Sequence, residues 1–183
     1  MHEVKDMTRK PVLKRSNSFF TVMSRIVILV GLSTPVYSHQ EALALTFKHM
    51  EISTVVNTVF QDGDGWLWFG TWSGLRKFDG YSFTTYTTVT GDRRSISHNI
   101  VTSIIQDRDG MLWIGTEGGG LNRMDRTTGR FTHYRHDPAD SSSLSHDMVS
   151  ALVEDAEGAL WIGTTGGGLN RMDRTSERFT RYR

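Results

Sequence analysis

One stretch of fourteen residues constrains the fold of this chain more than any other feature. Leu112–Asp125 returns almost unchanged at 160–173, and a looser copy occupies 67–79. When the 24 residues that begin at 112 are aligned with the 24 that begin at 160, 20 positions are identical. The copies recur at intervals of 45 and 48 residues when aligned on Trp68, Trp113 and Trp161. This period is typical of four-stranded propeller blades and predicts a repeat array.

Each copy divides into four short strands. In the second copy, β-branched residues over 100–106 lead to an Asp-Gly turn, after which a second strand runs over 111–116. The Asp-Gly pair predicts a two-residue hairpin turn, because Gly and Asp tolerate the positive φ that such a turn needs. Strands over 121–125 and 130–135 complete the copy, with a turn at 126–129 between them.

The second strand is apolar at consecutive positions, Leu112, Trp113 and Ile114, instead of alternating. Such a run indicates that both faces of the sheet are covered, as in a blade between two neighbours. We therefore expect an all-β protein, an incomplete β-propeller of about three four-stranded antiparallel blades. One blade alone should not fold, because it could bury only one of its two apolar faces.

The first 38 residues differ from the repeats. Lys and Arg residues precede a mostly apolar run over 19–36, which is the pattern of a signal peptide for export. Its uninterrupted apolar part is too short to span a bilayer, which takes about 20 residues. A disordered leader and an uncleaved anchor are the alternatives. The expected segments are a leader at 1–38, a linker with an orphan strand at 39–50, and blades at 51–92, 93–139 and 140–183.

Charge and polar motifs favour neither catalysis nor nucleic-acid binding. The formal net charge is only +1. A set of arginines in the second and third copies alternates with aromatic residues, a pattern also found in nucleic-acid binding, but most lie near the third turn among aspartates: Arg123, Arg126, Arg130, Arg135, Arg171, Arg174, Arg178 and Arg183. We interpret them as a solvated rim. His133 and His136 fall on opposite faces of a strand, which disfavours a metal site. The sequence thus predicts no catalytic residue, no metal and no cofactor, and no acidic or histidine pair supports a propeller lyase or glycosidase.

Propeller geometry predicts where a ligand would bind. The turn between the second and third strands and the connection into the next blade lie on one face of the disc, and loops on a rigid scaffold carry function. The predicted ligand-binding residues are Trp72, Arg94, His98, Glu117 and His146. The same face should carry Ser73, Arg93, Asp137, Asp147 and Thr165. Trp72 is the strongest candidate because an aromatic ring can stack on a sugar; the alternative is that Trp72 packs against the second blade.

The pattern Asp-x-x-Gly-x-Leu-Trp-Ile-Gly-Thr, read within 101–125 and 149–173, resembles the two-component regulator propeller repeat, and the resemblance covers 45–183. The resemblance implies a parent protein with a signal sequence, further blades, a membrane span, and a histidine kinase or diguanylate cyclase. It also implies a non-catalytic sensor of glycan fragments or similar ligands at the periplasmic or extracytoplasmic face of the inner membrane.

Two functions remain open at this point. The first is the ligand-sensing part of a bacterial signal-transduction receptor, with its catalytic module outside these residues. The second is a short propeller protein that completes a ring by self-association, since open strand edges and exposed blade faces are sticky. The expected partners are a carbohydrate or other small extracytoplasmic ligand, and other blades or a second copy of the chain. No nucleic-acid partner is expected. Contact with a membrane is expected only through the signal segment or the rest of the parent protein.

Overall fold

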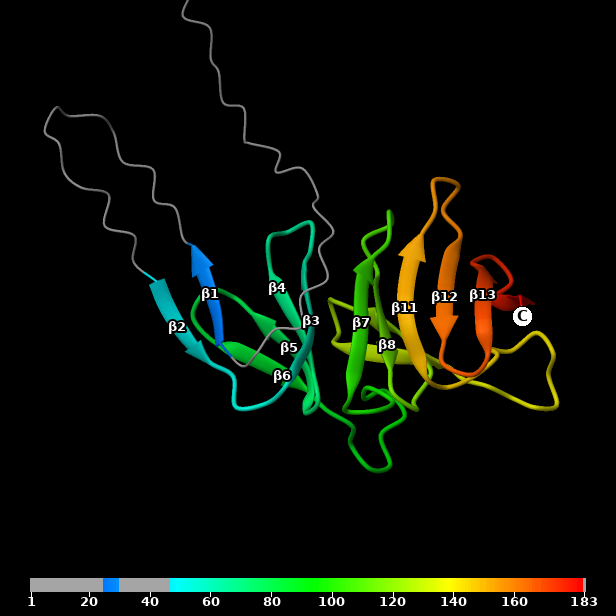
Figure 1. Ribbon diagram of the computed structural model, residues 1–183, viewed down its shortest axis with the longest axis horizontal. Helices are drawn as coiled ribbons and strands as arrows, with labels where there is room; N and C mark the ends of the chain where they lie inside the picture. The colour runs from blue at the N-terminus through cyan, green and yellow to red at the C-terminus, as the bar shows by residue number, and fades with distance from the viewer. Residues whose placement is uncertain (1–24, 30–46, 183) are drawn as a thin grey trace, which may run out of the picture.

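A computed structural model describes residues 25–29 and 47–182 as three four-stranded sheets and one two-stranded sheet (Figure 1). Each four-stranded sheet is antiparallel, with its strands neighbouring one another in chain order. The predicted all-β fold, an incomplete propeller of about three four-stranded blades, is confirmed. The three sheets lie side by side and do not close into a ring.

The three blades share one strand plan. Blade 1 contains β3 (Val56–Gln61), β4 (Leu67–Thr71), β5 (Gly74–Phe78) and β6 (Phe83–Tyr86). Blade 2 contains β7 (Val101–Gln106), β8 (Leu112–Thr116), β9 (Leu121–Asp125) and β10 (Arg130–Tyr134). Blade 3 contains β11 (Val149–Glu154), β12 (Leu160–Thr164), β13 (Gly168–Asp173) and β14 (Arg178–Tyr182). The first strands contact one another, β3 with β7 and β7 with β11, so the blades follow in chain order.

A separate two-stranded sheet pairs β1 (Arg25–Leu29) with β2 (Phe47–Glu51). Strand β2 overlaps the orphan strand expected at 45–49 of the linker, of which residues 45 and 46 lie outside the described residues. Of the predicted leader, 1–24 and 30–38 also lie outside them, so the export signal remains a prediction. Among the described residues, no helix is long and apolar enough to cross a membrane.

One aspartate closes the first hairpin of each blade. In blade 2, Asp107 N donates to Met111 O, which leaves a three-residue loop in place of the predicted two-residue turn. Asp107 Oδ1 accepts the N–H groups of Asp109 and Met111, and its Oδ2 accepts Trp113 Nε1 at 2.7 Å. The longer loop forms because it satisfies these donors. The tryptophan bond recurs from Trp68 to Asp62 and from Trp161 to Asp155.

Two apolar cores fill the spaces between the blades. In the first core, Trp68 and Leu75 of blade 1 pack against residues of blade 2. In the second core, Trp113, Leu121 and Tyr134 of blade 2 pack against blade 3. All five residues of β8 are buried, which confirms that both faces of this strand are covered. Burying a large apolar side chain contributes about 1.5–3 kcal/mol, so each blade depends on its neighbours for stability.

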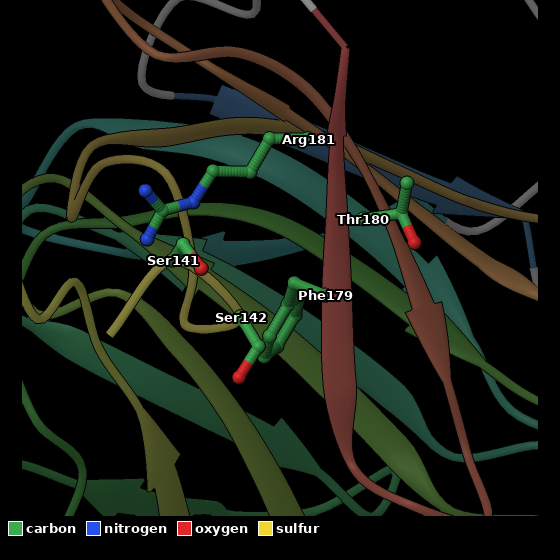
Figure 2. Close-up of a pocket in the computed structure, with 5 residues that line it drawn as sticks. All are labelled: Ser141, Ser142, Phe179, Thr180 and Arg181. Carbon is green, nitrogen blue, oxygen red and sulfur yellow. The ribbon is translucent and has the colours of Figure 1, made fainter.

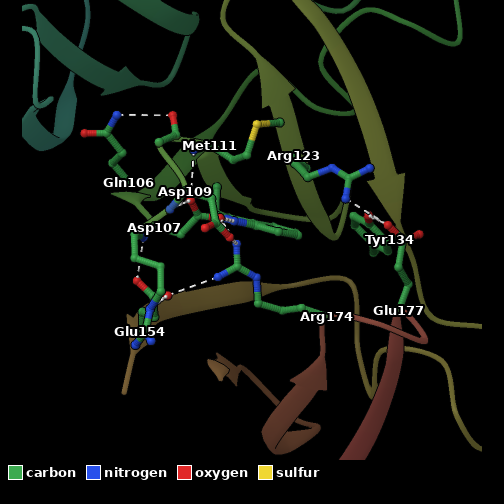
Figure 3. A network of polar contacts seen from close by, with 12 residues as sticks. Gln106, Asp107, Asp109, Met111, Arg123, Tyr134, Glu154, Arg174 and Glu177 are labelled. Atoms are coloured by element: carbon green, nitrogen blue, oxygen red, sulfur yellow. Dashed lines mark hydrogen bonds and ion pairs between the residues drawn. The ribbon is translucent and has the colours of Figure 1, made fainter. Parts of the chain in front are cut away.

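An arginine of blade 3 crosses to the first hairpin of blade 2 (Figure 3). Arg174 forms ion pairs with Asp107 and with Asp109, and its Nη1 lies 3.0 Å from Oε1 of Glu154. The side chain of Asp107 is almost fully buried, so the guanidinium compensates a carboxylate that has left water. We call this contact the arginine clasp.

The arginine clasp recurs one blade earlier. Arg126 of blade 2 lies 2.9 Å from Asp62 Oδ2 and 2.7 Å from Asp64 Oδ2, both in the first hairpin of blade 1. The Asp62 side chain is fully buried. Each clasp therefore joins an arginine directly after the third strand of one blade to the hairpin aspartate of the preceding blade.

Close backbone packing accompanies each clasp. An added Cβ on Gly70 would lie 2.7 Å from Val101 Cγ1, and one on Gly115 would lie 2.6 Å from Val149 Cγ1. Thr58 and Ser103 of the glycines' own blades lie closer still, at 2.5 and 2.3 Å. Real Cβ atoms do not approach other atoms so closely, so the blade's own first strand and the valine of the following blade together require glycine in the second strand. The blades consequently stack in one fixed register.

Candidate ligand-binding face

The turns after the second strands and the connectors into the next blades lie together on one side of the blades, which we call the connector face. Gly74 N donates to Asn99 O at 2.8 Å, which joins the blade 1 turn to the connector into blade 2. Gly118 N and Gly120 N donate to Asp147 O at 3.1 and 2.9 Å, which repeats the arrangement one blade later. The two kinds of segment expected to share a face therefore contact each other at both junctions.

Trp72 lies on this face at the turn after β4. The residue is 55% exposed, so about half of its surface faces solvent. The indole Nε1 donates to Asn57 Oδ1 at 3.1 Å, so the ring is fixed at its polar edge. A fixed and exposed aromatic ring is a platform on which the apolar face of a sugar can stack.

His98 and Glu117 meet at the entrance to blade 2. Nδ1 of His98 accepts Ile100 N at 3.2 Å, while Glu117 N donates to Ile100 O at 3.0 Å. An added Cβ on Gly119 would lie 2.8 Å from Cβ of His98, so the imidazole borders the glycine turn after β8. Glu117 is exposed, and its backbone is joined to the same residue, Ile100, that His98 binds.

His146 occupies the same position in blade 3. Its Nδ1 accepts Met148 N at 3.0 Å, and Thr165 N donates to Met148 O at 2.8 Å. The Nε2 side of the imidazole faces the turn glycine Gly166. His98 and His146 are therefore equivalent members of two neighbouring blades.

Arg94 lies away from the other predicted residues. Its carbonyl oxygen accepts Phe131 N at 2.9 Å, which attaches the connector to the beginning of the outermost strand β10. Here it lines a groove of about 400 Å³ together with Thr128 and Gly129 of the β9–β10 turn, which lies at the opposite end of the blade from the connector face. The connector takes this path because it covers the open backbone edge of β10.

Arg135 is a residue of the connector face that the sequence interpretation assigned to a solvated rim. Its Nε donates to Gly119 O at 3.2 Å, which brings a guanidinium to the glycine turn beside His98 and Glu117. The sequence offered one signal for this placement: Arg135 directly follows β10, the fourth strand of blade 2, and that strand ends at the connector face. Carboxylate, imidazole and guanidinium groups together can hydrogen-bond a ligand rich in hydroxyl groups.

The two histidines three residues apart hold connectors in place. His133 Nε2 lies 2.7 Å from Ser95 O, and His136 Nδ1 lies 2.8 Å from Leu144 O. Across the described part of the chain, no group of three or more His, Asp or Glu side chains could hold a metal ion.

A hollow of about 590 Å³ lies at the outer edge of blade 3 (Figure 2). It is lined by Ser141, Ser142, Phe179, Thr180 and Arg181. Arg181 Nε donates to Ser143 O at 3.0 Å, and Nη2 donates to Asp140 O at 2.9 Å. This guanidinium holds the connector against β14, which is the role of His133 one blade earlier.

Comparison with known proteins identifies the repeats. The family described as "Two component regulator propeller" matches 51–73, 95–118 and 143–166, one segment for each blade. Each segment runs from the end of a connector to the turn that follows the second strand of a blade. No curated protein sequence matches the chain.

Two similar solved structures are extracellular domains from B. thetaiotaomicron. The extracellular domain of a "putative hybrid two component system" is 32% identical to this chain and has a TM-score of 0.65. The match covers 69% of this chain and 18% of the solved domain. The extracellular domain of a "putative one component system" is 28% identical and has a TM-score of 0.59. This match covers 70% of the present chain and 19% of the solved domain. This chain spans less than a fifth of either structure.

A more distant structure shares only the fold. The virginiamycin B lyase from Staphylococcus aureus is 19% identical, with a TM-score of 0.56 over 77% of this chain and 46% of its own. The phased tryptophans, the three antiparallel blades and the family match in every blade agree with one another. The chain therefore carries one two component regulator propeller repeat in each of its three blades.

Proposed function

We propose that this chain is the ligand-sensing, non-catalytic propeller part of a bacterial signal-transduction receptor of the two-component histidine kinase or diguanylate cyclase type. The similarity to extracellular domains of two component and one component systems supports both the sensor role and an exported location at the periplasmic or extracytoplasmic side of the inner membrane. Kinase or cyclase activity would belong to a module of the parent protein outside these blades.

The connector face is the proposed ligand site, and the exposed Trp72 ring carries the proposal. Trp72 offers a stacking surface, while Glu117, His98 and Arg135 offer hydrogen-bond acceptors and donors at the next blade. This combination fits a glycan fragment or a similar small polar ligand, because sugars present an apolar ring face and hydroxyl groups.

Titration of the purified chain with neutral and acidic oligosaccharides, followed by isothermal titration calorimetry, tests the proposal. Trp72→Ala should weaken binding about tenfold, which corresponds to about 1.4 kcal/mol. Tyr81→Ala is the matched control, because Tyr81 is a 90% exposed aromatic residue in the β5–β6 turn at the opposite end of the blade. Absence of saccharide binding, or equal losses in the two variants, would contradict a glycan site at Trp72.

The alternative function is a propeller completed by self-association. The observation that favours it is the outward sheet face of blade 3, where Val153, Leu169 and Tyr182 are exposed. In such an assembly, blade 1 of a second copy would cover this face, and light scattering would detect a defined dimer.

A further inference from the structure

The two blade junctions differ at the turn between the third and fourth strands. Gly129 in blade 2 and Glu177 in blade 3 occupy the same position of this turn, two residues before a buried phenylalanine. Their φ angles are 70° and 54°, so the backbone adopts the same left-handed conformation in both turns. A glutamate side chain is therefore present at the second junction and missing at the first.

At the junction of blades 2 and 3, the carboxylate of Glu177 lies beside the tyrosine that ends the fourth strand (Figure 3). Tyr134 Oη donates to Glu177 Oε1 at 2.9 Å, and Arg123 Nη1 donates to the same oxygen at 2.8 Å. Hydrogen bonds to a carboxylate are stronger than those between neutral groups. This junction thus contains a position that binds one carboxylate, and a side chain of the protein occupies it.

The same position is open at the junction of blades 1 and 2. Tyr86 corresponds to Tyr134, and an added Cβ on Gly129 would lie 3.3 Å from Tyr86 Cε1. Tyr86 and Gly129 both line the groove of about 400 Å³ that also contains Arg94. Within the described residues, the hydroxyl of Tyr86 has no hydrogen-bond partner. Burial raises the pKa of Tyr86, so this hydroxyl stays protonated and can donate.

The cation that binds Glu177 has a counterpart as well. Lys77 takes the place of Arg123 in the third strand of blade 1. Its Nζ lies 5.7 Å from the centre of the Trp68 ring, which in turn stacks on Tyr86 with 6.1 Å between the ring centres. In the part of the chain that the structure describes, no carboxylate lies within salt-bridge distance of Lys77. An ammonium group without a countercharge is therefore available on this side of the ring.

The lining of the groove adds further positive charge. Arg94 and Arg130 are exposed lining residues, and neither forms a salt bridge with another described residue. Of the residues that line the groove, Asp92 alone is acidic, and its Oδ1 accepts Arg94 N at 2.8 Å. Hydroxyl-bearing residues also line it: Thr85, Thr87, Ser95 and Thr128. The groove can therefore attract an anion and hydrogen-bond hydroxyl groups attached to it.

We propose that this groove binds a small hydroxylated carboxylic acid. The carboxylate of the ligand takes the position that the Glu177 carboxylate has one junction later, where it accepts a hydrogen bond from the Tyr86 hydroxyl. A carboxylate is favoured over other anions because it is the group that the protein itself places there. The groove includes the β9–β10 turn, at the opposite end of the blade from the connector face, so this site does not depend on the ligand proposed for that face.

An NMR titration of the ¹⁵N-labelled chain with gluconate tests the proposal. Gluconate carries a carboxylate on a hydroxylated carbon chain, and sorbitol is the matched compound without the carboxylate. Gluconate should shift the backbone amide signals of Thr87 and Gly129, whereas sorbitol should leave them in place. Absence of these shifts, or equal shifts with sorbitol, would overturn the proposal.

Two variants examine the contacts of the carboxylate. Gly129→Glu places in the groove the side chain that Glu177 provides at the next junction, and it should weaken gluconate binding at least about tenfold. The variant should remain folded, because Glu177 adopts the same backbone conformation. Tyr86→Phe removes only the hydroxyl and should weaken binding about tenfold.

Trp72→Ala on the connector face is the matched control and should leave gluconate binding unchanged. Undiminished binding in Tyr86→Phe, or in a Gly129→Glu chain with native tryptophan fluorescence, would overturn the proposal. A loss in Trp72→Ala equal to that in Tyr86→Phe would do the same, because it would place gluconate on the connector face.

Discussion

At the scale of single residues, one buried carboxylate organises each blade junction. Asp107 binds two backbone N–H groups, the Trp113 indole and the Arg174 guanidinium, so it connects a turn, a core side chain and the next blade. Such a network is stabilising only while every member has its partner, because an uncompensated buried charge is costly.

Arg174→Ala should therefore destabilise the chain. The substitution leaves the almost fully buried Asp107 with its neutral donors but without a countercharge, and we expect a loss of about 1–3 kcal/mol in the free energy of unfolding. Urea denaturation followed by tryptophan fluorescence measures this loss. Arg174→Lys should recover only part of it, because an ammonium group lacks the planar fork that reaches several carboxylates.

Arg178→Ala serves as the control for Arg174→Ala. Arg178 is exposed at the start of β14, and substitutions of this kind usually change stability by less than about 0.5 kcal/mol. Equal losses for the two variants would contradict the importance of the clasp.

The sequence did not predict the clasp arginines, although it contained a signal for them. Arg126 and Arg174 directly follow an aspartate in two copies, and glycine stands there in the first copy. Alternation with aspartates is also typical of a solvated surface, and a linear pattern does not show that a side chain crosses to another blade. The same limitation applied to Arg94, whose connector follows the outer strand edge instead of the connector face.

At the scale of elements, the turns between third and fourth strands depend on ionised aspartates. Hydrogen bonds from the Thr128 hydroxyl and then from the Thr127 and Thr128 N–H groups lower the pKa of Asp125 below its usual value of 3.8. The N–H groups of Ser176 and Thr175 lower the pKa of Asp173 in the same way.

These lowered pKa values fix the sign of a pH dependence. Below pH 3.8 the unfolded chain takes up protons at these aspartates while the folded turns still hold them ionised, so stability is present above this pH and is lost as pH falls through the folded pKa values. The midpoint of urea unfolding should accordingly fall on acidification from about pH 5 to about pH 2. Asp125→Asn with Asp173→Asn should flatten this dependence, because the amide oxygen can accept the same N–H groups without titrating. An unchanged slope would contradict the role of these turns.

The elements themselves were largely predictable from the sequence. The 48-residue spacing, the consecutive apolar residues at 112–114 and the turn glycines predict the strand plan of blade 2, which the structure confirms. The prediction of a two-residue turn in the first hairpin was wrong, because the aspartate side chain stabilises a longer loop by accepting N–H groups within it. Side-chain closure of a turn is harder to read from a sequence than the Asp-Gly signal that marks the turn.

At the scale of the whole molecule, stability lies in the junctions and not in single blades. The core between blades 2 and 3 contains Trp113, Leu121 and Tyr134 from one side, and Leu144 and Phe179 from the other. The connector face extends across the same junctions, since the connector into one blade binds the turn of the preceding blade. Any ligand bound across this face would therefore be sensitive to how tightly the blades stack.

A chain that ends at residue 139 should lose the stability of blade 2 as well as blade 3. It would expose Trp113 and Leu121, which are now 2% and 0% exposed, and burying each such side chain is worth about 1.5–3 kcal/mol. Hydrogen exchange should consequently accelerate in β8 and β9, although the truncation removes no residue of these strands. Unchanged protection there would mean that blade 2 is stable on its own, and it would contradict a fold in which each blade is stabilised by the next.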